Sequence, residues 1–267
     1  MDPTNAEAWL LLLKILRVEG RLSSEADTGW TALNHVVPEM RFQILRELTL
    51  AALTDIPDNI ARNILKRWME ADPRDLDARV AYLRQLEVEA RADDPDREMR
   101  LAELSKLLSS HPKCIEVREV LLTALADAGE AEVGRRILEG WLPSNRDSRY
   151  WRLQGRWALE YDRRPEYAIS ALRTALMDLP QDWRSHYRLA RALKMVGCVE
   201  EARREVEIVR RLQELLDPTF LEPKLKASFT HLNDPRALQG LVEVCTRAGL
   251  SRLANAWRDV GNIELGR

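Results

Sequence analysis

The sequence lacks a long hydrophobic run. The apolar stretch from Trp9 to Leu13 ends at Lys14, which is far short of the roughly 20 residues that a membrane-spanning helix needs. No basic stretch precedes it, as one would in a secretion signal. We therefore expect a soluble protein that does not engage a membrane.

An excess of charge of one sign is also missing. The chain has 41 lysines and arginines against 43 aspartates and glutamates, which gives a formal net charge of -2. Domains that bind nucleic acid usually present a clear basic excess, because they must neutralise phosphates. From this balance we expect no nucleic-acid partner, and RNA binding ranks last among the functions that we consider.

Cysteine is scarce. Cys114, Cys198 and Cys245 are odd in number and lie 84 and 47 residues apart, which fits neither a disulfide framework nor the spacing of metal ligands. We expect core thiols in a reducing compartment, and this favours the cytoplasm. The sequence predicts no metal site.

Catalytic motifs are absent from the sequence. It contains no phosphate-binding glycine loop, no metalloprotease histidine pair and no serine elbow. His35, His111, His186 and His231 have no catalytic partner nearby in the sequence, so packing or turn roles are favoured for them. We expect no enzyme activity and no cofactor.

A regular spacing of prolines is present instead. Pro3, Pro38, Pro73, Pro112 and Pro180 follow one another at intervals of 35, 35, 39 and 68 residues, and 68 is twice 34. Proline cannot continue a helix and also pushes the preceding residue out of helical geometry. A proline at a fixed period therefore indicates a fixed joint between helices.

Small residues and glycines keep the same period. Ala26 and Ala61 are 35 residues apart, and intervals of 34 or 68 separate further positions, namely Gly134, Ala168 and Ala202, and Gly129 and Gly197. A small residue marks a close helix crossing, and a glycine after a helix lets the chain reverse. Apolar residues between these positions recur at helical spacing, so the sequence predicts an all-α fold.

A period near 34 with two short helices per unit resembles the tetratricopeptide repeat. The first unit, "AEAWLLLLKILRVEG", matches that pattern at Trp9, Leu12 and Gly20, and then, after one inserted residue, at Ala26, Trp30 and Pro38. The fifth unit matches at Trp151, Gly155, Ala168, Leu172, Ala175 and Pro180. In the sixth unit His186 takes the tryptophan position, followed by Leu189, Ala190, Gly197 and Ala202.

The resemblance implies a right-handed superhelical α-solenoid of about seven such repeats, in a single array over residues 1–267. The repeats start near residues 5, 40, 75, 114, 148, 183 and 235. An extra helical spacer is expected at about 217–234, because two spacings there exceed the period by 18 residues. Pentatricopeptide, HEAT and armadillo arrays are the alternatives, and the charge balance and small-residue positions favour the tetratricopeptide pattern.

The first helices of such repeats are expected to line a concave groove, which is the usual binding surface. In the fifth and sixth units, the face opposite the apolar stripe carries the candidate partner-binding residues Arg149, Arg152, Arg156, Arg184, Tyr187, Arg188, Arg191 and Lys194. Arginine forks suit carboxylates, so an acidic peptide is the expected ligand. The alternative is a solvated face whose charge is absorbed by acids such as Glu160, and Glu116 and Glu119 show that the face is not uniformly basic.

The sequence therefore predicts a non-enzymatic protein–protein interaction scaffold that binds a partner peptide or helix in its groove. One alternative is a regulatory or substrate-presenting arm of a larger enzyme or sensor, of which this chain is a fragment, because "MDPTN" begins at a repeat joint. Another is self-association through the N-terminal repeat, where Leu10, Leu11 and Leu13 lie beside the apolar stripe.

Overall fold

The computed structural model describes residues 5–54, 58–89, 94–232 and 234–265. Their regular structure is helical throughout, so the predicted all-α architecture of helix-turn-helix repeats is confirmed. The chain divides into two compact units: the terminal unit, residues 1–56 with 210–267, and the middle unit, residues 57–209. That residues 1–267 form one array stays a prediction. Residues 1–4, which suggested the fragment alternative, lie outside the described part.

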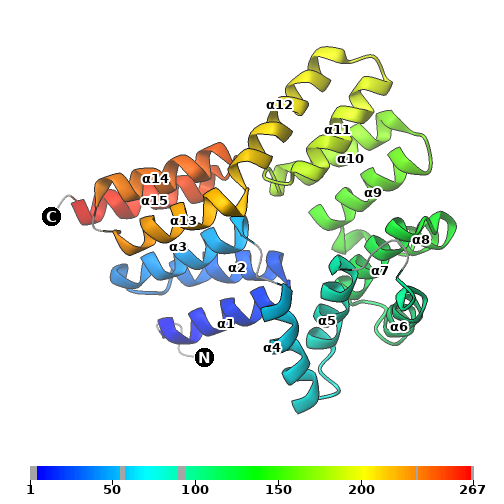
Figure 1. The fold of residues 1–267 in the computed structure, drawn as a ribbon, viewed down its shortest axis with the longest axis horizontal. Coiled ribbons are helices and arrows are strands. Elements are labelled where there is room, and N and C mark those ends of the chain that lie inside the picture. The colour runs from blue at the N-terminus through cyan, green and yellow to red at the C-terminus, as the bar shows by residue number, and fades with distance from the viewer. Residues whose placement is uncertain (1–4, 55–57, 90–93, 233, 266–267) are drawn as a thin grey trace. The chain divides into compact units, whose positions relative to one another are not determined.

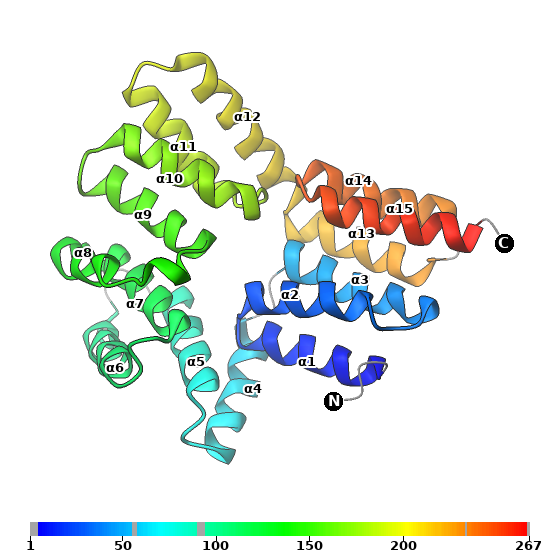
Figure 2. The same ribbon diagram turned by 180° about the vertical axis from the view of Figure 1, so that it is seen from behind.

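The terminal unit joins both ends of the chain. Its helices are α1 (Ala6–Val18), α2 (Leu22–Leu33), α3 (Pro38–Leu53), α13 (Pro218–Thr230), α14 (Pro235–Arg247) and α15 (Ser251–Leu265). Figures 1 and 2 show α3 between the pair α1 and α2 and the C-terminal helices, and α3 contacts α1, α2 and α15. Helix α13 lies at the place of the expected spacer.

One hydrophobic core holds this unit together. It combines N-terminal residues such as Leu13 and Ile44 with C-terminal ones such as Leu241 and Trp257, all of them fully buried. The Trp257 indole donates a hydrogen bond of 2.9 Å to the hydroxyl of Thr49 on α3. A polar bond formed inside the core fixes the register of α15 against α3, because an unpaired indole N–H there would be costly.

This core removes part of the basis of the self-association alternative, which stays a prediction. Leu13 is fully buried and Leu10 packs against the same core, whereas Leu11 is 61% exposed. Helices α2 and α3 pack on α1, and α15 packs on α3 in turn. Two of the three leucines on which this alternative depended are therefore occupied by packing within the unit.

The middle unit contains a run of consecutive helices. They are α4 (Asp58–Ala71), α5 (Leu76–Glu89), α6 (Arg97–Ser110), α7 (Ile115–Ala128), α8 (Ala131–Glu139), a 3-10 turn η1 (Pro143–Asn145), α9 (Ser148–Glu160), α10 (Pro165–Asp178), α11 (Trp183–Met195) and α12 (Val199–Leu215), which crosses the boundary at residue 209. From α4 to α11, each helix packs against the next one along the chain, and first helices also contact one another, as α5 does α7 and α7 does α9. These contacts bring equivalent helices of successive repeats side by side (Figure 1).

The first helix of every predicted repeat begins within two residues of the position expected from the sequence. The second repeat differs in one respect, because α3 belongs to the terminal unit and α4 to the middle unit. Helix α3 is buried among α1, α2 and α15, whereas α4 packs on α5. The repeat pattern located both helices but did not show that they belong to different units.

Five of the turns between paired helices use left-handed backbone. Gly20, Gly129, Gly197 and Gly249 all have positive φ, between 66° and 81°. In the fifth repeat, which lacks the turn glycine, Arg163 takes this role with φ 53°. It lies 34 residues from both Gly129 and Gly197, so the left-handed position keeps the period where the glycine itself is lost.

Replacing Arg163 by glycine is expected to stabilise the chain by about 1 kcal/mol, because the left-handed conformation strains an L-residue but not glycine. Urea denaturation of the wild type and of Arg163→Gly measures the difference. Arg164→Gly is the control, since Arg164 has φ -114° and gains nothing from glycine. A glycine variant less stable than the wild type would contradict the assignment of strain.

Small residues lie at the close helix crossings, and the predicted position is wrong in one of them. Gly134, Ala168 and Ala202 are buried as predicted. In α2, however, Ala26 is only half-buried, and the close approach occurs at Gly29, where an added Cβ would lie 2.5 Å from Leu48. The residue of α2 at the helix crossing therefore lies three positions after the one that the repeat pattern indicated.

The cysteines also differ from expectation. Cys245 is buried, Cys114 is half-buried and Cys198 is exposed, and all three are free. The core interpretation therefore holds for Cys245 alone, because Cys198 lies in the turn between α11 and α12. No helix in the described part of the chain is both long enough and apolar enough to cross a bilayer.

Candidate partner-binding surface

Helix α9 presents three of the predicted arginines on one face. The helix starts at an Asp147 cap, whose carboxylate accepts hydrogen bonds from the backbone N–H groups of Arg149 and Tyr150. Spacings of three and four residues then place Arg149, Arg152 and Arg156 along one ridge. The opposite side of α9, with Leu153 and Trp157, is buried.

Acidic residues of α7 face these arginines one by one. Arg149 Nη1 lies 3.1 Å from a carboxylate oxygen of Glu116, and Arg152 Nη2 lies 2.6 Å from one of Glu119. Glu119 also accepts from Arg84 of α5 at 3.3 Å. Three successive first helices are thus connected by charge-assisted hydrogen bonds.

The same pattern continues from α9 to α11. Arg156 contacts Asp127 of α7 at 2.7 Å and Glu160 of its own helix at 2.9 Å. Glu160 in turn accepts from Arg188 of α11 at 2.9 Å. We call this network the charge ladder; its members are Arg84, Glu116, Glu119, Asp127, Arg149, Arg152, Arg156, Glu160 and Arg188.

Partial burial makes the charge ladder more than a set of exposed pairs. The side chains of Arg149 and Arg156 are each 14% exposed. Burial alone would lower the pKa of Arg149, but its bonds to Asp147 and Glu116 and the nearby Glu119 outweigh burial and raise it. Burial would likewise raise the pKa of Glu160, yet hydrogen bonds from Arg156 and Arg188 leave it below its usual value. Arg149 and Glu160 therefore remain charged at neutral pH.

The other four predicted residues lie outside the charge ladder. Arg184, Tyr187, Arg191 and Lys194 are exposed on α11, and Tyr187 is 50% exposed. We call these four the α11 ridge. The Arg184 guanidinium lies 4.7 Å from the ring centre of Trp183, and that of Arg191 lies 6.0 Å from the ring centre of Tyr187. Both guanidiniums thus rest near aromatic rings rather than against carboxylates.

The structure therefore separates the eight predicted residues into two groups. One group is paired with acids and consists of Arg149, Arg152, Arg156 and Arg188. For this group the alternative interpretation holds, in which acids such as Glu160 absorb the charge of the arginines. The cations of the α11 ridge form no ion pair with the described residues. A signal for the ladder was present in the sequence, because Glu116 and Glu119 each precede their arginine partner by 33 residues, about one repeat.

His186 has a role that the sequence only partly indicated. The ring is buried, which agrees with a packing role in the tryptophan position. Its Nε2 lies 3.0 Å from the carbonyl oxygen of Pro180, and its Nδ1 lies 2.6 Å from a carboxylate oxygen of Glu205 on α12. Both nitrogens thus serve to join the two helices of the sixth repeat to the preceding turn. Nothing in the sequence pointed to Glu205.

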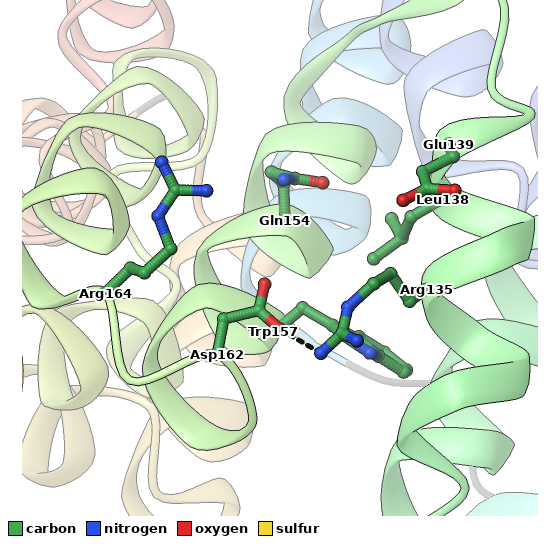
Figure 3. A pocket seen from close by; sticks show the side chains of 7 residues that line it. All are labelled: Arg135, Leu138, Glu139, Gln154, Trp157, Asp162 and Arg164. Atoms are coloured by element: carbon green, nitrogen blue, oxygen red, sulfur yellow. Dashed lines mark hydrogen bonds and ion pairs between the residues drawn. The ribbon is translucent and has the colours of Figure 1, made fainter.

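A pocket of about 320 Å³ lies between α8, α9 and the turn before α10. Figure 3 shows its lining residues, which are Arg135, Leu138, Glu139, Gln154, Trp157, Asp162 and Arg164. Arg135 and Asp162 form an ion pair there. Two arginines are balanced by two carboxylates in the lining, so the pocket offers no net charge to a ligand.

Comparisons with known proteins show no family for this chain. No protein-family profile matches the sequence, and no curated protein matches it. Two similar solved structures are IFIT1 monomeric mutants, one with Gppp-AAAA and the other with m7Gppp-AAAA. Each has 17% sequence identity and a TM-score of 0.45, over 96% of this chain and 59% of the other. The chain thus spans about three-fifths of the length of the proteins that it matches.

These structures correct the exclusion of nucleic-acid partners. That exclusion came from the near-neutral charge of the whole chain, and it was wrong as an argument, because similar helical proteins were solved with capped oligoadenylates. Net charge is a sum over the molecule, whereas a ligand meets only a local surface. The α11 ridge carries three cations, so the charge of this local surface differs from the net charge of the whole chain.

Proposed function

We propose that this chain is a tetratricopeptide-like scaffold without enzyme activity, which binds a peptide or helix of a partner protein through the first helices of its middle unit. The observation that supports the proposal is the division of charge on these helices. The charge ladder neutralises its own members across α5, α7, α9 and α11. Next to it, the α11 ridge leaves three exposed cations and an exposed tyrosine.

A pre-ordered surface suits this role. Hydrogen bonds between successive first helices restrict the sliding of one repeat past the next, and each half-buried pair adds a modest stabilisation of about 1 kcal/mol or less. A partner that docks on such a surface loses less free energy to ordering the receptor. The same geometry supports a non-enzymatic role for His186, because both ring nitrogens are held by structural contacts.

Affinity capture from the native cell tests this function. The immobilised chain is incubated with extract, with and without ribonuclease, and the retained polypeptides are identified and shortened to the smallest segment that still binds. We expect a polypeptide segment that binds the isolated chain in one-to-one stoichiometry after ribonuclease treatment. Retention that disappears with ribonuclease would refute the proposal and show an RNA ligand instead.

A further inference from the structure

The charge ladder limits what a ligand can gain from half of the candidate surface. Arg149, Arg152, Arg156 and Arg188 each hold a carboxylate within 3.1 Å. A ligand carboxylate would have to displace that partner and leave the displaced acid unpaired in a half-buried position, which is unfavourable. The ladder arginines are therefore structural and are poor contact residues.

The α11 ridge has none of this cost. Arg184, Arg191 and Lys194 are exposed and form no ion pair with the described part of the chain. Positions 184, 187, 191 and 194 repeat at helical spacing, so their side chains share one face. At 1.5 Å per residue the ridge is about 15 Å long. Contact with Trp183 and Tyr187 restricts the two guanidiniums and leaves their N–H groups available to a ligand.

The length and charge of the ridge indicate the chemistry of its partner. Three unpaired cations over about 15 Å match two or three carboxylates on one side of a short peptide. A nucleic-acid strand gains its affinity by neutralising many phosphates, and beyond this ridge it would meet the carboxylates of the charge ladder. Tyr187, at 50% exposure between the cations, offers an apolar face as well.

We propose that the α11 ridge, formed by Arg184, Tyr187, Arg191 and Lys194, binds a short acidic segment of a partner protein that carries an apolar side chain against Tyr187. The inference rests on the proposed scaffold function and names the contact residues and the chemistry of the partner. Arginine forks and the lysine ammonium hold the carboxylates, while the charge ladder keeps α11 in place beside α9.

The test uses the full chain and a fluorescein-labelled dodecapeptide of Glu-Glu-Leu triplets, followed by fluorescence anisotropy at low and moderate salt. The Arg191→Glu, Lys194→Glu double variant is expected to weaken binding by about tenfold or more. The matched control, Arg204→Glu with Arg211→Glu, makes the same change of charge at exposed positions of α12, and we expect it to stay within about twofold of the wild type. Arg152→Gln, in the charge ladder, is likewise expected to bind the peptide within about twofold of the wild type.

Several results would overturn the inference. Equal losses in the ridge and control variants would show attraction by net charge alone. Equal affinity for a Gln-Gln-Leu peptide would exclude carboxylate recognition, and tighter binding of oligoadenylate that depends on Arg191 and Lys194 would show that the ridge reads phosphates. If a captured partner segment bound the ridge variant as tightly as the wild type, the ridge would be refuted while the scaffold function would stand.

Discussion

Raising the pH from 5 to 9 is expected to lower the free energy of unfolding of this chain by about 3 to 5 kcal/mol through one residue, Glu25 of α2. Glu25 is fully buried, and neither of its carboxylate oxygens has a hydrogen-bond partner among the described residues. Burial raises its pKa from 4.5 to about 8; the charge of Arg17 opposes this rise and that of Glu47 adds to it. The Arg17 guanidinium is held by Thr54, at 2.6 Å from the hydroxyl.

The sign of the effect follows from proton binding. Between pH 4.5 and about 8 the unfolded chain has lost the Glu25 proton while the folded chain retains it. Each rise in pH in this window therefore favours the unfolded state, and the loss is complete once the folded carboxyl has also ionised. The contribution of Glu25 to stability is therefore fully present below pH 4.5 and is lost as the pH rises past about 8.

The Glu25→Gln variant isolates this contribution. Glutamine keeps the shape but does not ionise, so we expect the slope with pH to flatten and the variant to exceed the wild type in stability at pH 9. Glu222→Gln changes an exposed glutamate of the same unit and is expected to leave the profile unchanged. Urea denaturation followed by circular dichroism at pH 5, 7 and 9 gives the comparison. A wild-type profile without slope, or a slope that persists in Glu25→Gln, would refute the assignment.

Replacing Gly134 by alanine is expected to destabilise the chain by about 3 kcal/mol, because the added methyl group overpacks the crossing of α8 and α9. Its Cβ would lie 2.0 Å from Cζ2 of Trp157. That ring is 1% exposed, and its Nε1 donates a hydrogen bond of 3.1 Å to the carbonyl oxygen of Ala131 on the same helix as Gly134. The indole therefore has little room to withdraw.

A double-mutant cycle tests this cause directly. In a Trp157→Leu background the obstructing ring is absent, so Gly134→Ala is expected to cost less than about 1 kcal/mol, with a coupling energy near 2 kcal/mol. Gly240→Ala is the matched control, since its nearest contact is an ordinary 3.6 Å to the Ser228 hydroxyl. Additive losses in the cycle would show that Gly134 is needed for a reason other than the approach of Trp157.

Much of the fold follows from the local conformational preferences of residues that can be recognised in the sequence. Prolines and left-handed turn residues recur near a period of 34, and every first helix starts within two residues of its expected position. Even Arg163, which replaces a turn glycine, takes the left-handed backbone that the period requires. Such features are readable because they depend on residues a few positions apart.

The candidate surface was predicted less completely. The sequence placed all eight candidate residues on first helices, but it could not separate the paired arginines from the free cations. Pairing depends on which side chains of α7, α9 and α11 come within about 3 Å, and helix packing sets these distances. The acids Glu116 and Glu119 were visible in the sequence, and their contacts with Arg149 and Arg152 were not.

The sequence by itself determined the helices, their joints and the all-α repeat architecture of this protein, because each of these arises from interactions within one or two turns. Only the tertiary structure decided that α3 and α15 share a core, that Glu25 is enclosed without a hydrogen-bond partner among the described residues, and that the ladder arginines are paired with acids while the cations of the α11 ridge are not. Burial and ion pairing depend on residues far apart along the chain, so they are settled only when the helices have packed.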